Sequence, residues 1–128
     1  MKLLLDTHVF LWWLTDDRRL SPRAKRAVRD GKNDVFVSAA SAWEIAIKTR
    51  LGRVTLPEDA ERYIADQLER NAFQVLPIRL PHALRVASLP DVHRDPFDRL
   101  LVAQALIEDL VILSEDRRLT GYPVRVLW

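Results

Sequence analysis

The feature that most constrains the fold is a series of short apolar runs that alternate with helix-forming segments. The first run, 2–5, ends at Asp6. Runs this short are typical of buried strands. Strands that alternate with helices favour an α/β fold, with a mainly parallel sheet covered by helices on both faces. Ligands of such sheets bind beyond the carboxyl ends of the strands, so the residues that follow each run are the first candidates for a site.

The expected elements follow one another without a repeat or a linker. We expect five short strands, at 2–5, 34–37, 73–78, 110–113 and 124–127. We expect helices at 8–14, 22–30, 38–51, 57–71, 81–88 and 96–109, with a loop at 89–94. Pro22 at a first helical position and Gly31 and Gly52 after helix ends support these boundaries. The 128 residues are enough for one domain, which we expect to span 1–128.

Composition limits the chemistry and the location. The chain has no cysteine, which excludes disulfides and thiolate metal sites and fits a reducing cytoplasm. No apolar run approaches the ~20 residues that span a bilayer. Asp6 interrupts the first apolar run too early for a signal peptide, so we expect a cytoplasmic protein without membrane contact. Of 20 basic residues 16 are arginines, which suit phosphate contacts, although a GC-rich genome explains this bias equally well.

Two aspartates follow predicted strands. Asp6 comes directly after the first strand, and Asp116 comes a short turn after the strand 110–113. If both strands are central and parallel, the two carboxylates lie at the same edge of the sheet. Asp6 can instead serve only as the N-cap of the helix that begins at His8.

Glu44 lies inside the predicted helix 38–51. Ser41 and Glu44 have the spacing of a capping box, and Glu44 can also pair with Lys48 four residues later. Glu44 shares one helical stripe with three apolar residues, Ala40, Ile47 and Leu51. We therefore expect its carboxylate to border apolar neighbours rather than open solvent, and both structural roles stay open.

The segment Asp95-Pro96-Phe97-Asp98 is the most informative. Asp95 suits an N-cap with Pro96 at the first helical position, and Asp98 suits the first turn. Asp98 also continues an apolar stripe, formed by Leu101, Val102 and Ala105. A buried carboxylate needs a partner. No arginine or lysine lies on that face, although Arg99 is adjacent, and a divalent cation would supply the missing charge.

Four acids are therefore candidates for one metal site: Asp6, Glu44, Asp98 and Asp116. Like charges this close repel one another, and one or two Mg²⁺ or Mn²⁺ ions would relieve the repulsion. Oxygen ligands without cysteine suit these ions better than zinc. Such a site polarises a phosphodiester and activates water against it.

Three segments in this order resemble the PIN-domain family, and within it the VapC-type ribonuclease toxins. They are LLLDTHVFLWWL (3–14), VSAASAWEIAIKTRLGRV (37–54) and HRDPFDRLLVAQALIEDLVILSEDRRL (93–119). The resemblance implies a PIN-like three-layer α/β/α fold and assigns the acidic quartet to Asp6, Glu44, Asp98 and Asp116. It places four supporting residues beside the quartet: Thr7, Ser114, Asp95 and Arg99.

Each supporting residue has an expected role. Thr7 and Ser114 would hold carboxylates or a metal-bound water. Asp95 is expected to cap a helix first and to serve the metal site second. Arg99 would face substrate phosphate or pair with a neighbouring acid. The three histidines, His8, His82 and His93, show no ligand spacing and are expected to be structural or surface residues.

The resemblance further implies a function and partners. It implies an endoribonuclease that depends on Mg²⁺ or Mn²⁺ and acts as the toxin of a VapBC-type toxin–antitoxin pair. The implied partners are an RNA substrate, a VapB-type antitoxin and a second copy of the chain in a homodimer.

Other functions remain as alternatives. A haloacid-dehalogenase phosphatase needs an acid two residues after the first, where this chain has His8. A receiver domain needs an early Asp pair and a late Lys, and neither is in place. A non-catalytic, Arg-rich module that binds nucleic acid or protein, with the acids as helix caps, is the alternative from a different class.

Overall fold

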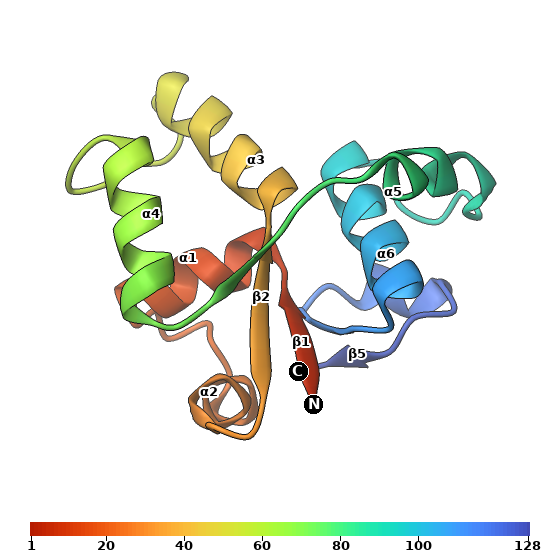
Figure 1. Ribbon diagram of the computed structural model, residues 1–128, viewed down its shortest axis with the longest axis horizontal. Coiled ribbons are helices and arrows are strands. Elements are labelled where there is room, and N and C mark those ends of the chain that lie inside the picture. Colours follow the sequence, from red (N-terminus) through yellow and green to blue (C-terminus); the bar gives the residue numbers. More distant parts are fainter.

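The computed structural model describes residues 1–128 and is built on one parallel sheet of five strands (Figure 1). The strands are β1 (Lys2–Leu5), β2 (Asp34–Ser38), β3 (Gln74–Leu76), β4 (Val111–Leu113) and β5 (Val126–Leu127). Their order across the sheet is β3-β2-β1-β4-β5, and every neighbouring pair is parallel. This arrangement confirms the expected mainly parallel sheet.

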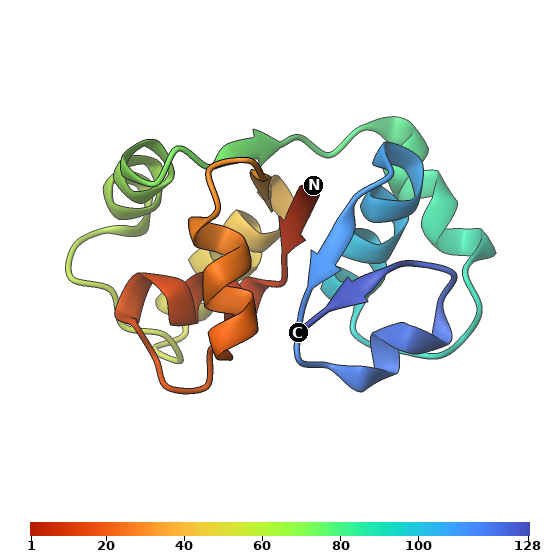
Figure 2. The same cartoon turned by 90° about the horizontal axis from the view of Figure 1, so that it is seen from below.

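Helices cover both faces of the sheet, which gives the expected three layers (Figure 2). They are α1 (Thr7–Thr15), α2 (Pro22–Arg29), α3 (Ala39–Arg50), α4 (Ala60–Arg70), α5 (Leu80–Arg85) and α6 (Pro96–Glu108). Two short 3₁₀ helices, η1 (Val86–Ser88) and η2 (Arg117–Gly121), complete the chain. None of the helices is both long and apolar enough to cross a membrane.

The alternation of side chains along β1 builds two separate cores. Leu3 and Leu5 join a cluster with residues of α1, α2, α3 and α4, whereas Leu4 joins a cluster with residues of α6 and η2. Successive strand residues point to opposite faces of a sheet, so a strand in the middle of the sheet must be apolar on both sides. This requirement explains the continuous apolar runs in the sequence.

Most boundaries match the expected ones, and the differences have local causes. The helix expected over 57–71 begins at Ala60 because Asp59 supplies the N-cap, accepting a hydrogen bond from the N–H of Arg62. The capping box that the spacing of Ser41 and Glu44 allows is absent. Ser38 caps α3 instead, because β2 runs directly into the helix.

The order of the strands creates a crevice between β1 and β4. The chain proceeds from β1 outward to β2 and β3, and then returns to the other side of β1 for β4 and β5. The carboxyl ends of β1 and β4 are joined by a hydrogen bond from the N–H of Asp6 to the carbonyl of Leu113, 3.0 Å long. Such a reversal is where α/β sheets bind their ligands.

Candidate active site

Asp6 lies in this crevice, at the junction between β1 and α1. Its Oδ1 accepts a hydrogen bond from the N–H of His8 (3.2 Å), so it caps α1. Its Oδ2 accepts a hydrogen bond from Ser114 Oγ (2.6 Å), which follows β4. Asp6 is buried although no lysine or arginine contacts it. The cap and a place in the crevice are therefore compatible roles for one carboxylate.

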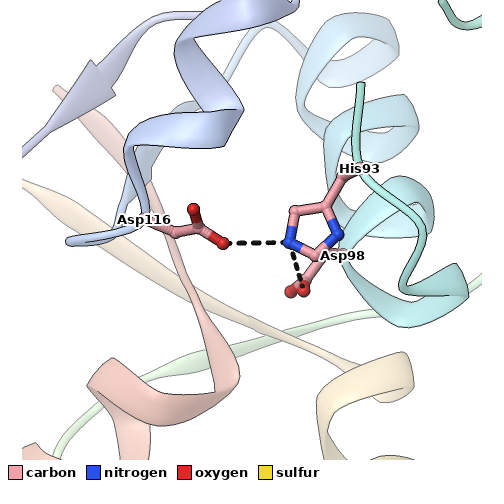
Figure 3. A group of neighbouring side chains, drawn as sticks. All are labelled: His93, Asp98 and Asp116. Carbon is pink, nitrogen blue, oxygen red and sulfur yellow. Dashed lines mark hydrogen bonds and ion pairs between the residues drawn. The ribbon is translucent and has the colours of Figure 1, made fainter. Parts of the chain in front are cut away.

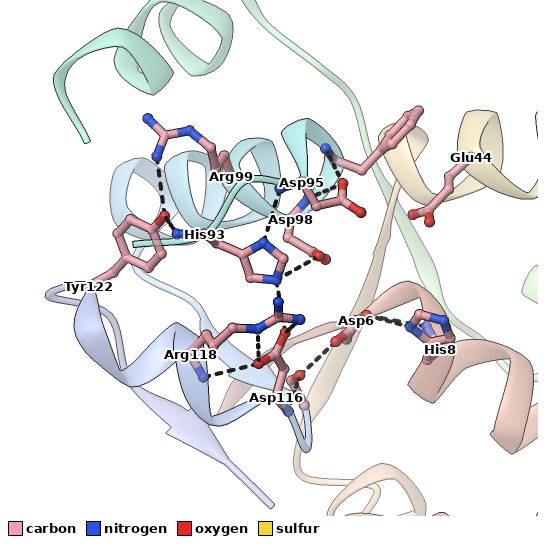
Figure 4. Close-up of polar contacts among 12 residues, drawn as sticks. Asp6, His8, Glu44, His93, Asp95, Asp98, Arg99, Asp116, Arg118 and Tyr122 are labelled. Carbon is pink, nitrogen blue, oxygen red and sulfur yellow. Dashed lines mark hydrogen bonds and ion pairs between the residues drawn. The ribbon is translucent and has the colours of Figure 1, made fainter. Parts of the chain in front are cut away.

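Asp98 and Asp95 come from the first turn of α6. Asp95 caps the helix, and its Oδ1 accepts hydrogen bonds from the N–H groups of Phe97 and Asp98. Asp98 projects from the first turn toward the carboxyl ends of β1 and β4 (Figure 4). The helix thus presents one acid at its start and a second acid inside the crevice.

Glu44 reaches the same space from α3 (Figure 4). Its residue is only 4% exposed, and its Oε2 pairs with Lys48 Nζ at 2.7 Å, as the spacing of the two residues predicts. Its Oε1 is buried and has no hydrogen-bond partner. The apolar stripe expected around it is only partly buried, since Leu51 is 59% exposed. An unpartnered buried carboxylate oxygen is costly and calls for a ligand.

Asp116 follows β4 and lies against a histidine that was not expected in the site. His93 Nε2 lies 2.9 Å from Asp116 Oδ2 and 3.2 Å from Asp98 Oδ2 (Figure 3). His93 is buried, so the expectation of a structural or surface residue holds only in its structural part, and it did not include a place beside the acids. That expectation was based on the absence of ligand spacing in the sequence, but the loop before α6 folds back and brings the His93 ring between the two acids.

The acids act strongly on one another. Burial, followed by the charges of its neighbours, raises the pKa of Asp98 to about 8. The neighbours are, in order of effect, Asp6, Asp95, Glu44 and Asp116. The charges of these four acids therefore all act on the pKa of Asp98. Without a cation, Asp98 keeps its proton at neutral pH.

Asp116 is shifted in the opposite direction. Hydrogen bonds from the side chain of Arg118, and then from its backbone N–H and from His93, lower the pKa of Asp116 to about 2. The Arg118 guanidinium contacts both carboxylate oxygens, at 3.0 and 2.9 Å. Since the Arg118 side chain is 65% exposed, this ion pair can exchange with solvent or with a phosphate.

Two of the expected supporting contacts are not made. Arg99 faces neither the cleft nor a site acid: its guanidinium donates to the carbonyls of Val86, Leu89 and Pro90. It points to the far side of α6, where unpaired loop carbonyls need a donor. The expected alternative, a pair with a neighbouring acid, is found at the exposed Asp91, whose Oδ1 lies 4.0 Å from Arg99 Nη1. Thr7 Oγ1 donates to Ser41 Oγ (2.8 Å) rather than to a carboxylate, because α3 packs against the start of α1.

A polar cleft of about 780 Å³ opens above these residues. Asp6, Asp95, Asp98, Asp116 and His93 line it, and its rim carries three basic residues, Arg94, Arg117 and Arg118. Arginine guanidinium groups suit phosphate oxygens. The cleft thus combines an acidic floor with a basic rim.

The donors in the cleft fit a hard divalent cation. They are carboxylate oxygens from several elements, with no sulfur. One atom each of His93, Asp98 and Asp116 lies within 4.8 Å of the others. Asp6 and Glu44 lie outside this close group, although the unpartnered oxygen of Glu44 is on the same side of the site (Figure 4). The raised pKa of Asp98 also favours a bound cation, because a cation would offset the repulsion between the acids.

Comparison with known proteins gives the family. The sequence model of the PIN domain matches residues 3–124 of the chain. The chain therefore belongs to the PIN-domain family. This PIN domain is 29% identical over 121 residues to ribonuclease VapC22 of Mycobacterium tuberculosis, a match that covers 94% of the chain and 91% of VapC22.

A second relative matches over a shorter stretch. This PIN domain is 43% identical over 56 residues to ribonuclease VapC16 of the same organism, which is 44% of the chain but only 38% of VapC16. The match with VapC16 therefore spans well under half of that relative's length.

Solved structures share the fold at low sequence identity. VapBC2 from Rickettsia felis, solved with a DNA fragment from its promoter, has a TM-score of 0.73 and 11% identity, covering 99% of this PIN domain and 98% of that chain. VapBC from Salmonella typhimurium, bound to DNA, has a TM-score of 0.68 and 17% identity, covering 99% and 97%. The three-layer architecture is thus that of VapC-type proteins.

Proposed function

We propose that this PIN domain is an endoribonuclease that depends on Mg²⁺ or Mn²⁺ and acts as the toxin of a VapBC-type pair. In this proposal Asp6, Glu44, Asp98 and Asp116 hold one or two ions. The cleft is the place where RNA is cut. The kinship with ribonucleases VapC22 and VapC16 supports the reaction class.

One observation carries the proposal. Acids from four separate elements surround the crevice between β1 and β4, and burial together with the charges of these acids raises the pKa of Asp98 to about 8. Four acids serving only as helix caps would have no reason to share one crevice. Metal ligation gives a reason for the convergence and for the buried Glu44 oxygen, and a phosphate-containing substrate gives a reason for the basic rim.

In this proposal the cation and the residues around it have separate roles in RNA cleavage. A bound Mg²⁺ or Mn²⁺ would supply Lewis-acid chemistry, which neutralises phosphate charge and lowers the pKa of water. Ser114 fixes the rotamer of Asp6 through its hydrogen bond to Oδ2. Arg94 and Arg117, both exposed on the rim, would bind phosphates of the RNA. The N-terminus of α6 directs its dipole toward the same negative charge.

RNA cleavage with a matched pair of variants tests the reaction. Purified protein without an antitoxin should cut mixed RNA with Mg²⁺ or Mn²⁺ and should stop when EDTA is added. Asp98→Asn should lower the rate by at least about 100-fold while the fold survives, because the amide resembles the protonated carboxyl that the metal-free site already contains.

Asp34→Asn is the control, since it makes the same change at an exposed position at the opposite end of the sheet. Its rate should equal that of the wild type. Well-folded wild-type protein that cuts no RNA with either metal would favour the Arg-rich binding module instead.

The proposal includes two protein partners. VapBC2 from Rickettsia felis and VapBC from Salmonella typhimurium are structural neighbours, which supports a VapB-type antitoxin for this chain. Exposed apolar side chains on α3 (Trp43 and Ile47), on the residue that follows it (Leu51) and on α5 (Leu80 and Leu84) support a homodimer. A cytoplasmic location follows from this role and stays a prediction.

Light scattering on purified protein tests the dimer. The wild type should have twice the mass of one chain, and Leu80→Asp combined with Leu84→Asp should reduce it to a monomer. A monomeric wild type would remove the homodimer from the proposal and leave the nuclease untouched. Co-purification of a small partner encoded beside this chain would support the antitoxin.

A further inference from the structure

His93 is a histidine that lies between two of the acids of the site. It is buried, it lies in the loop before α6, and its Nε2 faces two carboxylates at once (Figure 3). Those carboxylates come from separate elements, since Asp98 belongs to α6 and Asp116 follows β4. The imidazole is therefore a bridge between two parts of the fold.

Contacts on the far side of the loop fix the position of His93 independently of the acids. The N–H of His93 donates to the hydroxyl of Tyr122 at 2.8 Å. Arg99 Nη1 donates to the same hydroxyl at 3.2 Å and to the carbonyl of Pro90 at 2.9 Å. Tyr122 is itself buried. Arg99, which sequence alone placed near substrate, thus holds the loop that carries His93.

The hydrogen bonds of the ring determine where its proton lies. The backbone N–H of Asp95 donates to His93 Nδ1 at 3.0 Å. A backbone N–H can only donate, so Nδ1 must be the acceptor and carries no proton. The neutral ring then carries its proton on Nε2, the nitrogen that faces Asp98 and Asp116. An Nε2–H group donates a hydrogen bond and has no lone pair for a cation.

We propose that His93 is a positioning residue of the metal site: its Nε2–H donates to Asp116, lies 3.2 Å from Asp98 Oδ2, and holds the two carboxylates in place for a cation that it does not itself ligate. This inference rests on the metal site proposed above. Hydrogen-bond donors behind ligating carboxylates contribute to metal affinity, and their loss typically weakens binding by about 10- to 100-fold.

His93 differs in this role from Arg118, the other donor to Asp116. The Arg118 side chain is 65% exposed and is free to leave for a phosphate, whereas the His93 side chain is 4% exposed and is locked by the contact with Asp95. Only the buried, locked donor also reaches Asp98. We therefore assign the positioning of the pair to His93.

Two conservative variants separate this role from the others. In His93→Gln the amide NH₂ can take the place of Nε2–H and still donate to the carboxylates. In His93→Asn the side-chain oxygen can still accept from the N–H of Asp95, in the turn that Asn favours, but the side chain is too short to reach Asp98 and Asp116. The first variant keeps the proposed contact, and the second keeps only the contact within the loop.

The measurement is the affinity of the full chain for Mn²⁺, by calorimetry without RNA. We expect His93→Gln to stay within about threefold of the wild type and His93→Asn to bind at least about 10-fold more weakly. Equal losses in the two variants would overturn the inference in favour of direct ligation. Wild-type affinity in His93→Asn would overturn it in favour of a role in the loop alone.

The outcome for the wild type separates this inference from the proposed function. Wild-type protein that binds no Mn²⁺ would remove the metal site and this role together. Mn²⁺ binding with equal variants would remove only the role of His93.

A second readout does not depend on any variant that must fold. Nitrogen-15 NMR of the imidazole rings reports which ring nitrogen carries the proton, and the chain has only three histidines to assign. We expect the His93 proton on Nε2 both without metal and at saturating Mg²⁺. A proton on Nδ1 in the Mg²⁺-bound protein would show that Nε2 has become a ligand and would overturn the inference.

Discussion

Lowering the pH from 8 to 6 should weaken the binding of Mn²⁺ by about 50-fold. Burial and the neighbouring acids raise the pKa of Asp98 to about 8, so this carboxyl must lose a proton before it can bind a cation. Competition from the proton weakens the apparent affinity by a factor of 1 + 10^(pKa − pH). This factor is about 100 at pH 6 and about 2 at pH 8, and their ratio gives the expected change.

Calorimetry in two buffers with different ionisation enthalpies measures both the affinity and the protons released. At pH 6 each Mn²⁺ that binds should release close to one proton from Asp98. In Asp98→Asn the release should disappear, whereas the exposed control Asp34→Asn should behave as the wild type. An affinity that is the same at pH 6 and pH 8, with no proton released, would show that Asp98 is not the buried, repelled acid described above.

Three further perturbations follow from the charges of the site. Between pH 4 and 8 the native protein holds a proton on Asp98 that the unfolded chain releases, so the melting temperature without metal should fall as the pH rises. Asp98→Asn should flatten this slope, and an unaltered slope in the variant would contradict the raised pKa of Asp98. Glu44→Gln should abolish most of the rise in melting temperature that Mn²⁺ causes, because it removes a carboxylate whose buried oxygen has no other partner. An undiminished rise would exclude Glu44 as a ligand. Arg118→Ala should move the pKa of Asp116 from about 2 toward its ordinary value, which carboxyl NMR can follow, and should change the free energy of unfolding by less than about 1 kcal/mol because the Arg118 side chain is 65% exposed. An unchanged pKa would show that other groups hold it low.

The sheet could be predicted from the sequence because its determinants are local. β1 and β4 are continuous apolar runs, which only strands buried on both faces require. Parallel strands place their carboxyl ends at one edge, so the proximity of Asp6 and Asp116 follows from two short segments. The buried start of α6 was similarly visible, because Asp98 continues the apolar stripe of its helix.

The surroundings of these acids could not be predicted, because they depend on contacts between distant segments. The sequence indicates that Asp98 needs a partner, but the ring that contacts it comes from His93, outside the helix, in a loop without periodicity. That loop is shaped by Arg99 and by Tyr122, which is 29 residues away from His93. Ser41 likewise bonds to Thr7 rather than capping α3, because of how two helices pack.

Anomalous diffraction at the manganese edge, from crystals grown with Mn²⁺, tests most directly whether these acids share a cation. We predict a manganese peak in the cleft, within about 2.5 Å of carboxylate oxygens from Asp98 and from at least one of Asp6, Glu44 and Asp116. The nearest His93 nitrogen should lie farther away, hydrogen-bonded to the ligating carboxylates. A cleft without a peak at saturating Mn²⁺, or a peak held only by exposed acids elsewhere, would contradict the metal site and the function built on it.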